Sequence, residues 1–119
     1  MSASALSSNS AKDVVLAFVH ALNSENFAAA RELASDDLSF VGVMGSREGA
    51  DAYFKDMERM RLKYDVKKVF AEGDDVCLLS DLAISNLTIF CCSWYRVQRS
   101  KVKSLQVIFD PRPLLNASK

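Results

Sequence analysis

The stretch that decides the fold is Thr88-Ile-Phe-Cys-Cys-Ser-Trp-Tyr-Arg-Val97, followed by Lys101-Val-Lys-Ser-Leu-Gln-Val-Ile-Phe109. Both segments are rich in β-branched and aromatic residues, and a short polar turn joins them, which is typical of a β-hairpin. Asp110-Pro-Arg-Pro113 ends the second strand, because proline has no amide hydrogen to donate to a neighbouring strand. The pair therefore predicts two antiparallel strands of a curved sheet.

The chain before this hairpin predicts three helices and three more strands. Ser10-Ala-Lys-Asp13 has the form of a capping box, and apolar residues at helical spacing follow it to about Asn23. A second helix is expected from Phe27 to Ala34, and a third begins after Ser46 as its cap. Alternating residues predict strands over 38–43, 64–72 and 76–84. The predicted order is ααβαββββ, which places the helices first and a meander last.

Composition limits the possible partners. The 119 residues are enough for one domain with one core. The 15 basic and 15 acidic residues give a formal net charge of zero, so no long-range field attracts nucleic acid or an anionic membrane. Little repulsion between copies also leaves self-association unopposed. We find no Gly-rich phosphate loop and no metal-spaced Cys and His cluster, so the sequence predicts no metal and no cofactor.

The cysteines bear on the cellular compartment of the protein, and the ends of the chain bear on the bounds of its domain. Cys77, Cys91 and Cys92 lie in apolar runs, which favours reduced thiols in a cytoplasmic protein. Residues 1–10 are small and polar without a cationic start, so we expect a disordered lead-in and not a signal peptide. We expect one domain over residues 11–113 and a tail over 114–119. No apolar run is long enough to span a membrane.

Several strands are apolar on both faces. Residues 76–79 and 89–92 are consecutive apolar runs. In a sheet with one solvent-exposed face, polar and apolar residues would alternate more regularly along each strand. The helices can cover only one face. A second copy of the chain on the other face is the simplest cover, so we expect a homodimer.

The order of these segments resembles the SnoaL-like group of the nuclear transport factor 2-like superfamily, which has a cystatin-like fold. The resemblance rests on Val15-Leu-Ala-Phe-Val-His-Ala-Leu-Asn23, Phe27-Ala-Ala-Ala-Arg-Glu-Leu33, Ser35-Asp-Asp-Leu-Ser-Phe40, Gly45-Ser-Arg-Glu-Gly-Ala50 and Trp94-Tyr-Arg-Val97. It implies an α+β cone in which three N-terminal helices pack on a strongly curved antiparallel sheet. It also implies a cavity between the helices and the concave face, and dimers that form through the convex face.

The resemblance argues against steroid isomerisation. That chemistry needs a carboxylate base, with a tyrosine and a neutral aspartic acid as an oxyanion hole. The corresponding positions fall on Phe18 for the tyrosine, near Gly42 for the base and on Ser93 for the acid. None of these residues can perform the required step. His20 lies away from the apolar stripe of its helix, so a histidine-dependent pair is not expected either.

Asp81 is the candidate catalytic residue. Strand alternation puts it on one face with Cys77, Leu79 and Ala83, and the resemblance turns that face toward the cone. A carboxylate desolvated there would have a raised pKa, as a general acid or base needs. Two alternatives remain open: Asp81 bonds a hydroxyl or an arginine, or it lies where the strand meets water.

The remaining candidates divide between the two faces of the sheet. Ser93 and Tyr95 are expected to assist Asp81 in proton transfer, cyclisation or dehydration of a small, largely apolar molecule. The alternative is a non-catalytic dimeric interaction module with a filled cone. The expected pocket consists of Phe18, Tyr53, Phe54, Met57, Leu79, Cys91, Leu105, Val107 and Phe109. The expected dimer interface consists of Leu78, Leu82, Cys92, Trp94, Arg96 and Ile108.

Overall fold

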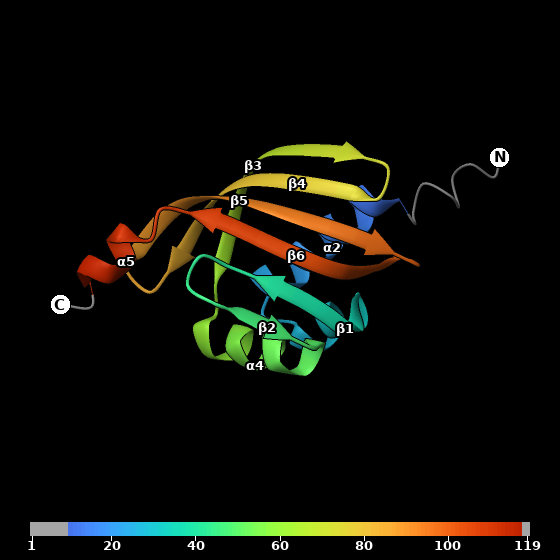
Figure 1. Ribbon diagram of the computed structural model, residues 1–119, viewed down its shortest axis with the longest axis horizontal. Coiled ribbons are helices and arrows are strands. Elements are labelled where there is room, and N and C mark those ends of the chain that lie inside the picture. The colour runs from blue at the N-terminus through green and yellow to red at the C-terminus, as the bar shows by residue number, and fades with distance from the viewer. Residues whose placement is uncertain (1–9, 118–119) are drawn as a thin grey trace.

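Helices on one side of a six-stranded sheet make up the fold, which is described here for residues 10–117 of a computed structural model (Figure 1). The expected lead-in at residues 1–9 lies outside the described residues. The predicted α+β class is confirmed. In chain order the elements are α2 (Ala11–Asn23), α3 (Phe27–Glu32), β1 (Ala34–Val41), β2 (Ser46–Glu48), α4 (Ala50–Met60), β3 (Lys63–Glu72), β4 (Asp75–Ile84), β5 (Leu87–Gln98), β6 (Lys101–Phe109) and α5 (Arg112–Ala117).

The strands lie in the order β2-β1-β6-β5-β4-β3. Neighbouring strands from β3 to β6 pair antiparallel through tight hairpins, as the meander predicts. β1 instead pairs parallel with β6, with Phe40 opposite Leu105, and antiparallel with β2. Register shifts in the β3–β4 and β5–β6 pairs add local twist. The helices α2 and α4 contact the inner face of this sheet, and in Figure 1 α2 lies behind it.

Two elements differ from the sequence prediction. Ser46 does not cap the third helix but belongs to the short strand β2, which forms a hairpin with β1. The residue at the helix N-cap is Gly49, whose φ of 94° suits glycine better than any other residue. After the β6 strand the chain forms the short helix α5 where we expected only a tail. Arg112 and Asp110 form an ion pair of 2.6 Å at the start of this helix.

The core forms where α2 and α4 meet the inner face of the sheet. The capping contact predicted for Ser10 is present, because its Oγ accepts a hydrogen bond from the amide of Asp13. Phe18 of α2 is fully buried between α4 and β5, with its ring centroid 6.1 Å from Phe54 and 6.2 Å from Tyr95. This aromatic cluster fills one part of the cone and fixes the helices against the sheet.

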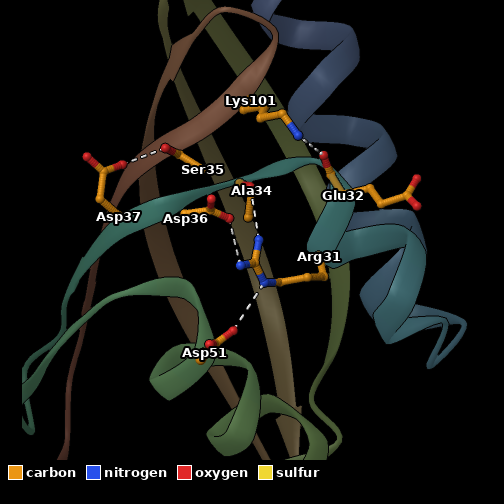
Figure 2. Close-up of polar contacts among 8 residues, drawn as sticks. All are labelled: Arg31, Glu32, Ala34, Ser35, Asp36, Asp37, Asp51 and Lys101. Atoms are coloured by element: carbon orange, nitrogen blue, oxygen red, sulfur yellow. Dashed lines mark hydrogen bonds and ion pairs between the residues drawn. The ribbon is translucent and has the colours of Figure 1, made fainter.

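Arg31 ties three elements together at the end of α3 (Figure 2). Its Nη2 donates to Asp36 of β1 at 2.8 Å, and its Nε reaches Asp51 of α4 at 3.4 Å. Its Nη1 donates to the carbonyl of Ala34. Lys101 reinforces the same corner by donating to the carbonyl of Glu32 at 2.7 Å. The helical layer is thereby held to the β1 and β6 strands, which support the cavity.

Candidate functional site

A cavity of about 240 Å³ opens at the end of the sheet where β6 ends and α5 begins. The loop between β1 and β2, helix α4 and the ends of β3, β4 and β6 form its wall. The wall is mainly apolar, as is usual for a small-molecule site. Its apolar residues include Phe40, Val43, Met44, Met57, Met60, Leu62, Leu82, Ile84, Val107, Phe109 and Leu114.

Two tyrosines contribute to the wall, and a third is buried outside it. Tyr53 of α4 and Tyr64 of β3 line the cavity, and Tyr95 of β5 is fully buried in the core. All three side chains are buried, and Tyr53 is only 1% exposed. Within residues 10–117, the hydroxyls of Tyr53 and Tyr95 have no hydrogen-bond partner. The Tyr95 hydroxyl lies close to the side chains of Tyr64 and Ser93, but at no hydrogen-bonding geometry.

Burial keeps these tyrosines neutral. It raises the pKa of Tyr53, Tyr64 and Tyr95 above the usual value of 10.0. A neighbouring tyrosine raises the pKa of Tyr53 and of Tyr95 further, and Cys91 does the same for Tyr64. The phenols are therefore hydrogen-bond donors over the whole physiological range. A buried hydroxyl without a partner costs roughly 1–3 kcal/mol, so native proteins rarely keep one. The cluster is thus suited to donate to an oxygen atom of a molecule in the cavity.

Two serines and a cysteine complete the polar interior. Ser80 of β4 and Ser93 of β5 are fully buried, and in the described part of the chain the Ser80 hydroxyl has no hydrogen-bond partner. Ser80 faces Cys91 across the strand pair, and Cys91 lies 4.0 Å from Ser93. Burial raises the pKa of the Cys91 thiol, so it is protonated near neutral pH and is not a ready nucleophile. These groups can accept or donate hydrogen bonds, but they do not form a nucleophile and base pair.

Asn23, the last residue of α2, positions Tyr64. Its Nδ2 donates to the Tyr64 carbonyl at 2.9 Å, and its Oδ1 accepts from the Tyr64 amide at 2.7 Å. A primary amide matches a peptide group in this way because it offers a donor and an acceptor side by side. The contact holds the start of β3, and hence the Tyr64 ring, against the helix end.

Replacing Asn23 by alanine should lower the free energy of unfolding by about 1–3 kcal/mol, because two partly buried peptide groups lose their partners. Urea denaturation measures this change. The exposed Gln98→Ala is the control and should change stability by less than about 0.5 kcal/mol. Equal effects of both substitutions would contradict the role given to Asn23.

Charged residues gather at the mouth of the cavity. Arg47 of β2 donates to Asp56 of α4 at 2.8 Å, and Arg59 donates to the other oxygen of Asp56 at 3.3 Å. Arg47 also donates to the carbonyl of Ser46. Among the described residues that line the cavity, Arg47, Asp56 and Arg59 are the only charged ones. The mouth therefore carries two positive charges and one negative charge.

The prediction that Asp81 faces the cone is wrong. On β4 the buried side chains are Val76, Leu78, Ser80 and Leu82, so the odd-numbered residues face outward. The Asp81 side chain is 36% exposed and lies 3.6 Å from Lys67 in an ion pair. Its carboxylate is therefore not desolvated within the cone, and the reason for making it the catalytic residue is lost.

Three other residues of β4 also lie on the face opposite to the one expected. Leu79 was expected in the pocket but lies on the outer face, opposite Cys92. Leu78 and Leu82 were expected at the dimer interface but are buried inside, and Leu82 lines the cavity. The physical cause is that β4 is apolar on both faces, so alternation of polarity does not distinguish its inner face from its outer face.

The strands β5 and β6 place their residues on the expected faces. Cys91, Ser93, Tyr95, Leu105 and Val107 point inward and are buried. Of the expected pocket residues, the cavity is lined by Tyr53, Met57, Val107 and Phe109, whereas Phe18, Phe54, Cys91 and Leu105 belong to the packed core beside it. The residues on the outer face include Cys92, Trp94, Arg96 and Ile108.

Sequence reasoning missed four polar residues of the site. Tyr64 and Ser80 were not singled out, although an isolated polar residue within an apolar strand is a signal of a special position. Arg47 and Asp56 have no expected role in the sequence analysis either. Their meeting at the cavity depends on the β1–β2 hairpin, which the sequence did not reveal.

Comparisons with known proteins agree with this architecture. The SnoaL-like domain family matches residues 15–105, and the chain therefore belongs to it. A structure described as an NTF2-like protein of unknown function from Cytophaga hutchinsonii shares 47% sequence identity. The match covers 88% of this chain and 94% of that one, with a TM-score of 0.87. The predicted family is thus confirmed, and with it the NTF2-like cone.

More distant structures share the fold alone. An LEH-like epoxide hydrolase from M. tuberculosis has 23% identity, with coverage of 89% of this chain and 86% of that one and a TM-score of 0.74. A de novo designed protein with a curved β-sheet has 17% identity, 91% coverage of both chains and a TM-score of 0.74. A comparison with curated proteins gave no match. The fold thus occurs with and without known chemistry, and function has to be argued from the site.

Proposed function

We propose that the protein binds a small, largely apolar molecule that carries a hydrogen-bond-accepting oxygen. The observation that carries the proposal is Tyr53, which lines the cavity and whose buried hydroxyl has no hydrogen-bond partner among the described residues. A ligand oxygen would supply the missing partner, while the apolar wall would cover the rest of the molecule. Tyr64 lies at the same wall and offers a second donor.

Binding is favoured over catalysis by the ionisable groups around the cavity. Proton transfer, cyclisation or dehydration would need a group that exchanges a proton near neutral pH. Among residues 10–117, the cavity wall has one carboxylate, Asp56, and both its oxygens already accept from arginines. The tyrosines hold their protons because their pKa values are raised by burial. The site is therefore better suited to hold a molecule than to transform it.

The proposal is tested by titrating the neutral ketone octanone into wild type and Tyr53→Phe, with calorimetry as the readout. We expect octanone to bind wild type and to bind Tyr53→Phe about three- to tenfold more weakly, because one neutral hydrogen bond is lost. Stability without ligand should stay the same or rise, since an unpaired buried hydroxyl is removed.

The exposed Ser100→Ala in the β5–β6 turn serves as the control and should leave binding unchanged. Failure of octanone to bind wild type would contradict the proposal. Equal affinity of octanone for wild type and Tyr53→Phe would contradict the role of this hydroxyl.

We further propose that the protein forms a homodimer through the outer face of the sheet. Phe70, Phe90, Trp94 and Ile108 are between 46% and 59% exposed there. Cys77 pairs with both Phe70 and Trp94, Cys92 pairs with both Leu79 and Ile108, and Phe90 lies two residues before Cys92 on β5. A patch that meets its own copy must be self-complementary. This face carries both signs of charge beside its apolar centre, with Asp81 and Lys67 at one end and Asp75 and Arg96 at another. A second copy is therefore a suitable occupant.

We also propose that the protein acts in the cytoplasm. Cys77, Cys91 and Cys92 are all free thiols, which supports a reducing compartment. Within residues 10–117, no helix has the length and apolar character needed to cross a membrane.

A further inference from the structure

We infer that the mouth of the cavity selects ligands that carry a carboxylate at the end opposite their buried oxygen. The inference rests on the proposed function and goes further by naming the chemical class of the ligand. It follows from Arg47 and Arg59, which both approach Asp56 at the mouth and leave one positive charge uncompensated.

The number of donors at the mouth exceeds the number of acceptors. A guanidinium group has five N–H donors, whereas a carboxylate only accepts. In the described contacts, Arg47 uses its Nε and Nη1, and Arg59 uses its Nη2. Each oxygen of Asp56 already accepts one of these bonds. An incoming anion would thus find unused donors, and an incoming cation would have to compete with two arginines for Asp56.

Asp56 brings the two arginines together at the mouth. Asp56 is only 22% exposed, and it holds Arg47 from β2 and Arg59 from its own helix at one place on the cavity rim. Such pre-organisation lowers the entropy cost of binding a carboxylate. Arginine also matches the planar, two-oxygen shape of that group.

The two polar regions define the orientation of the ligand. Tyr53 and Tyr64 line the cavity as buried residues, Arg47 and Arg59 are exposed at its mouth, and apolar side chains of α4, β4 and β6 form much of the remaining wall. An apolar body with an oxygen at one end and a carboxylate at the other would satisfy both regions. A simple carboxylate with an alkyl chain would bind the arginines at the mouth without using the tyrosines, and it is enough to test the role of the arginines.

The test compares octanoate, octanone and octylamine, which share an eight-carbon chain and differ in head-group charge, by calorimetry at low and high salt. We expect octanoate to bind wild type more tightly than octylamine. The variant Arg59→Gln should weaken octanoate about fivefold and leave octanone unchanged, because the exposed guanidinium group attracts a charged ligand modestly and a neutral one not at all. Added salt should reduce the affinity for octanoate but not for octanone.

A second variant and a control make the result specific. Arg47→Gln should likewise weaken octanoate and spare octanone, whereas Arg99→Gln in the β5–β6 turn should change neither affinity. If octanone binds wild type but octanoate is insensitive to both mouth variants, the inference is overturned and the proposed function stands. Tighter binding of octylamine than of octanoate would overturn it as well. If none of the three probes binds, the proposed function itself fails.

Discussion

Raising the pH above 10 should unfold this protein in one cooperative step, and tyrosinate should appear only in that step. All three tyrosines of the chain, Tyr53, Tyr64 and Tyr95, are buried and have pKa values raised above 10.0 by desolvation. Above this pH the unfolded chain loses three phenolic protons that the folded chain retains. The free energy of unfolding should then fall by about 4 kcal/mol per pH unit, at about 1.4 kcal/mol for each proton.

The sign of the effect follows from proton binding. A group whose folded pKa is raised contributes its full stability below the unfolded pKa and loses it as the pH rises through the folded value. The experiment follows tyrosinate absorbance and circular dichroism during a rise in pH. Tyr53→Phe should reduce the slope by about a third, since one of three protons is removed. Tyrosinate absorbance that develops near pH 10 while secondary structure persists would show that the phenols are not buried as described.

Replacing Ile108 by lysine should convert a homodimer to monomers. Ile108 is 59% exposed in the single chain, so the substitution leaves the core intact. In a two-fold dimer every substitution occurs twice, so two ammonium groups would be buried in the apolar patch without partners. We expect the dimer to dissociate about a hundredfold more readily, and sedimentation velocity over a range of protein concentrations measures this.

Ala17→Lys is the matched control for the dimer. Ala17 is exposed on α2, which packs on the opposite face of the sheet, so the same change of side chain should not alter the oligomeric state. Circular dichroism confirms that both variants remain folded. A wild-type protein that is monomeric at all concentrations, or an Ile108→Lys variant that stays dimeric, would refute the proposed interface.

The fold could be predicted from the sequence because most of it rests on local signals. The length and β-rich composition of β5 and β6 and the polar turn between them predict the hairpin, although apolar residues such as Phe90, Trp94 and Ile108 also face outward. The short strand β2 could not be predicted in the same way. Its three exposed residues, 46–48, have no apolar face, and only pairing with β1 makes them a strand.

The turn between β4 and β5 determines which face of β4 points inward. The two-residue turn at Ser85 and Asn86 pairs Ile84 with Leu87. In an antiparallel pair joined in this way, each odd-numbered residue of one strand lies opposite an even-numbered residue of the other. Since Ser93 faces inward, its partner Leu78 must do so too. Turn length therefore determines the face where polarity does not.

The candidate site was harder to predict because its parts come from distant segments. Tyr53 and Tyr95 were recognised as possible contacts, but Tyr64 enters the cluster through Asn23, which is far from it in the sequence. Likewise, Arg47 meets Asp56 only because the chain turns at residues 42–45 between β1 and β2. Contacts of this kind depend on tertiary geometry and have no periodic signal.

The parallel pairing of β1 with β6 has a consequence for the order of folding. β1 lies in the first half of the chain, yet its neighbour on one side is the last strand. During synthesis the β1–β2 hairpin and the β3–β5 meander can form separately, but β6 must emerge before the two parts join into one sheet. Such long-range closure slows folding, because chain entropy is lost before the contacts form. The sheet that supports the cavity is therefore complete only after β6 has paired with both β1 and β5.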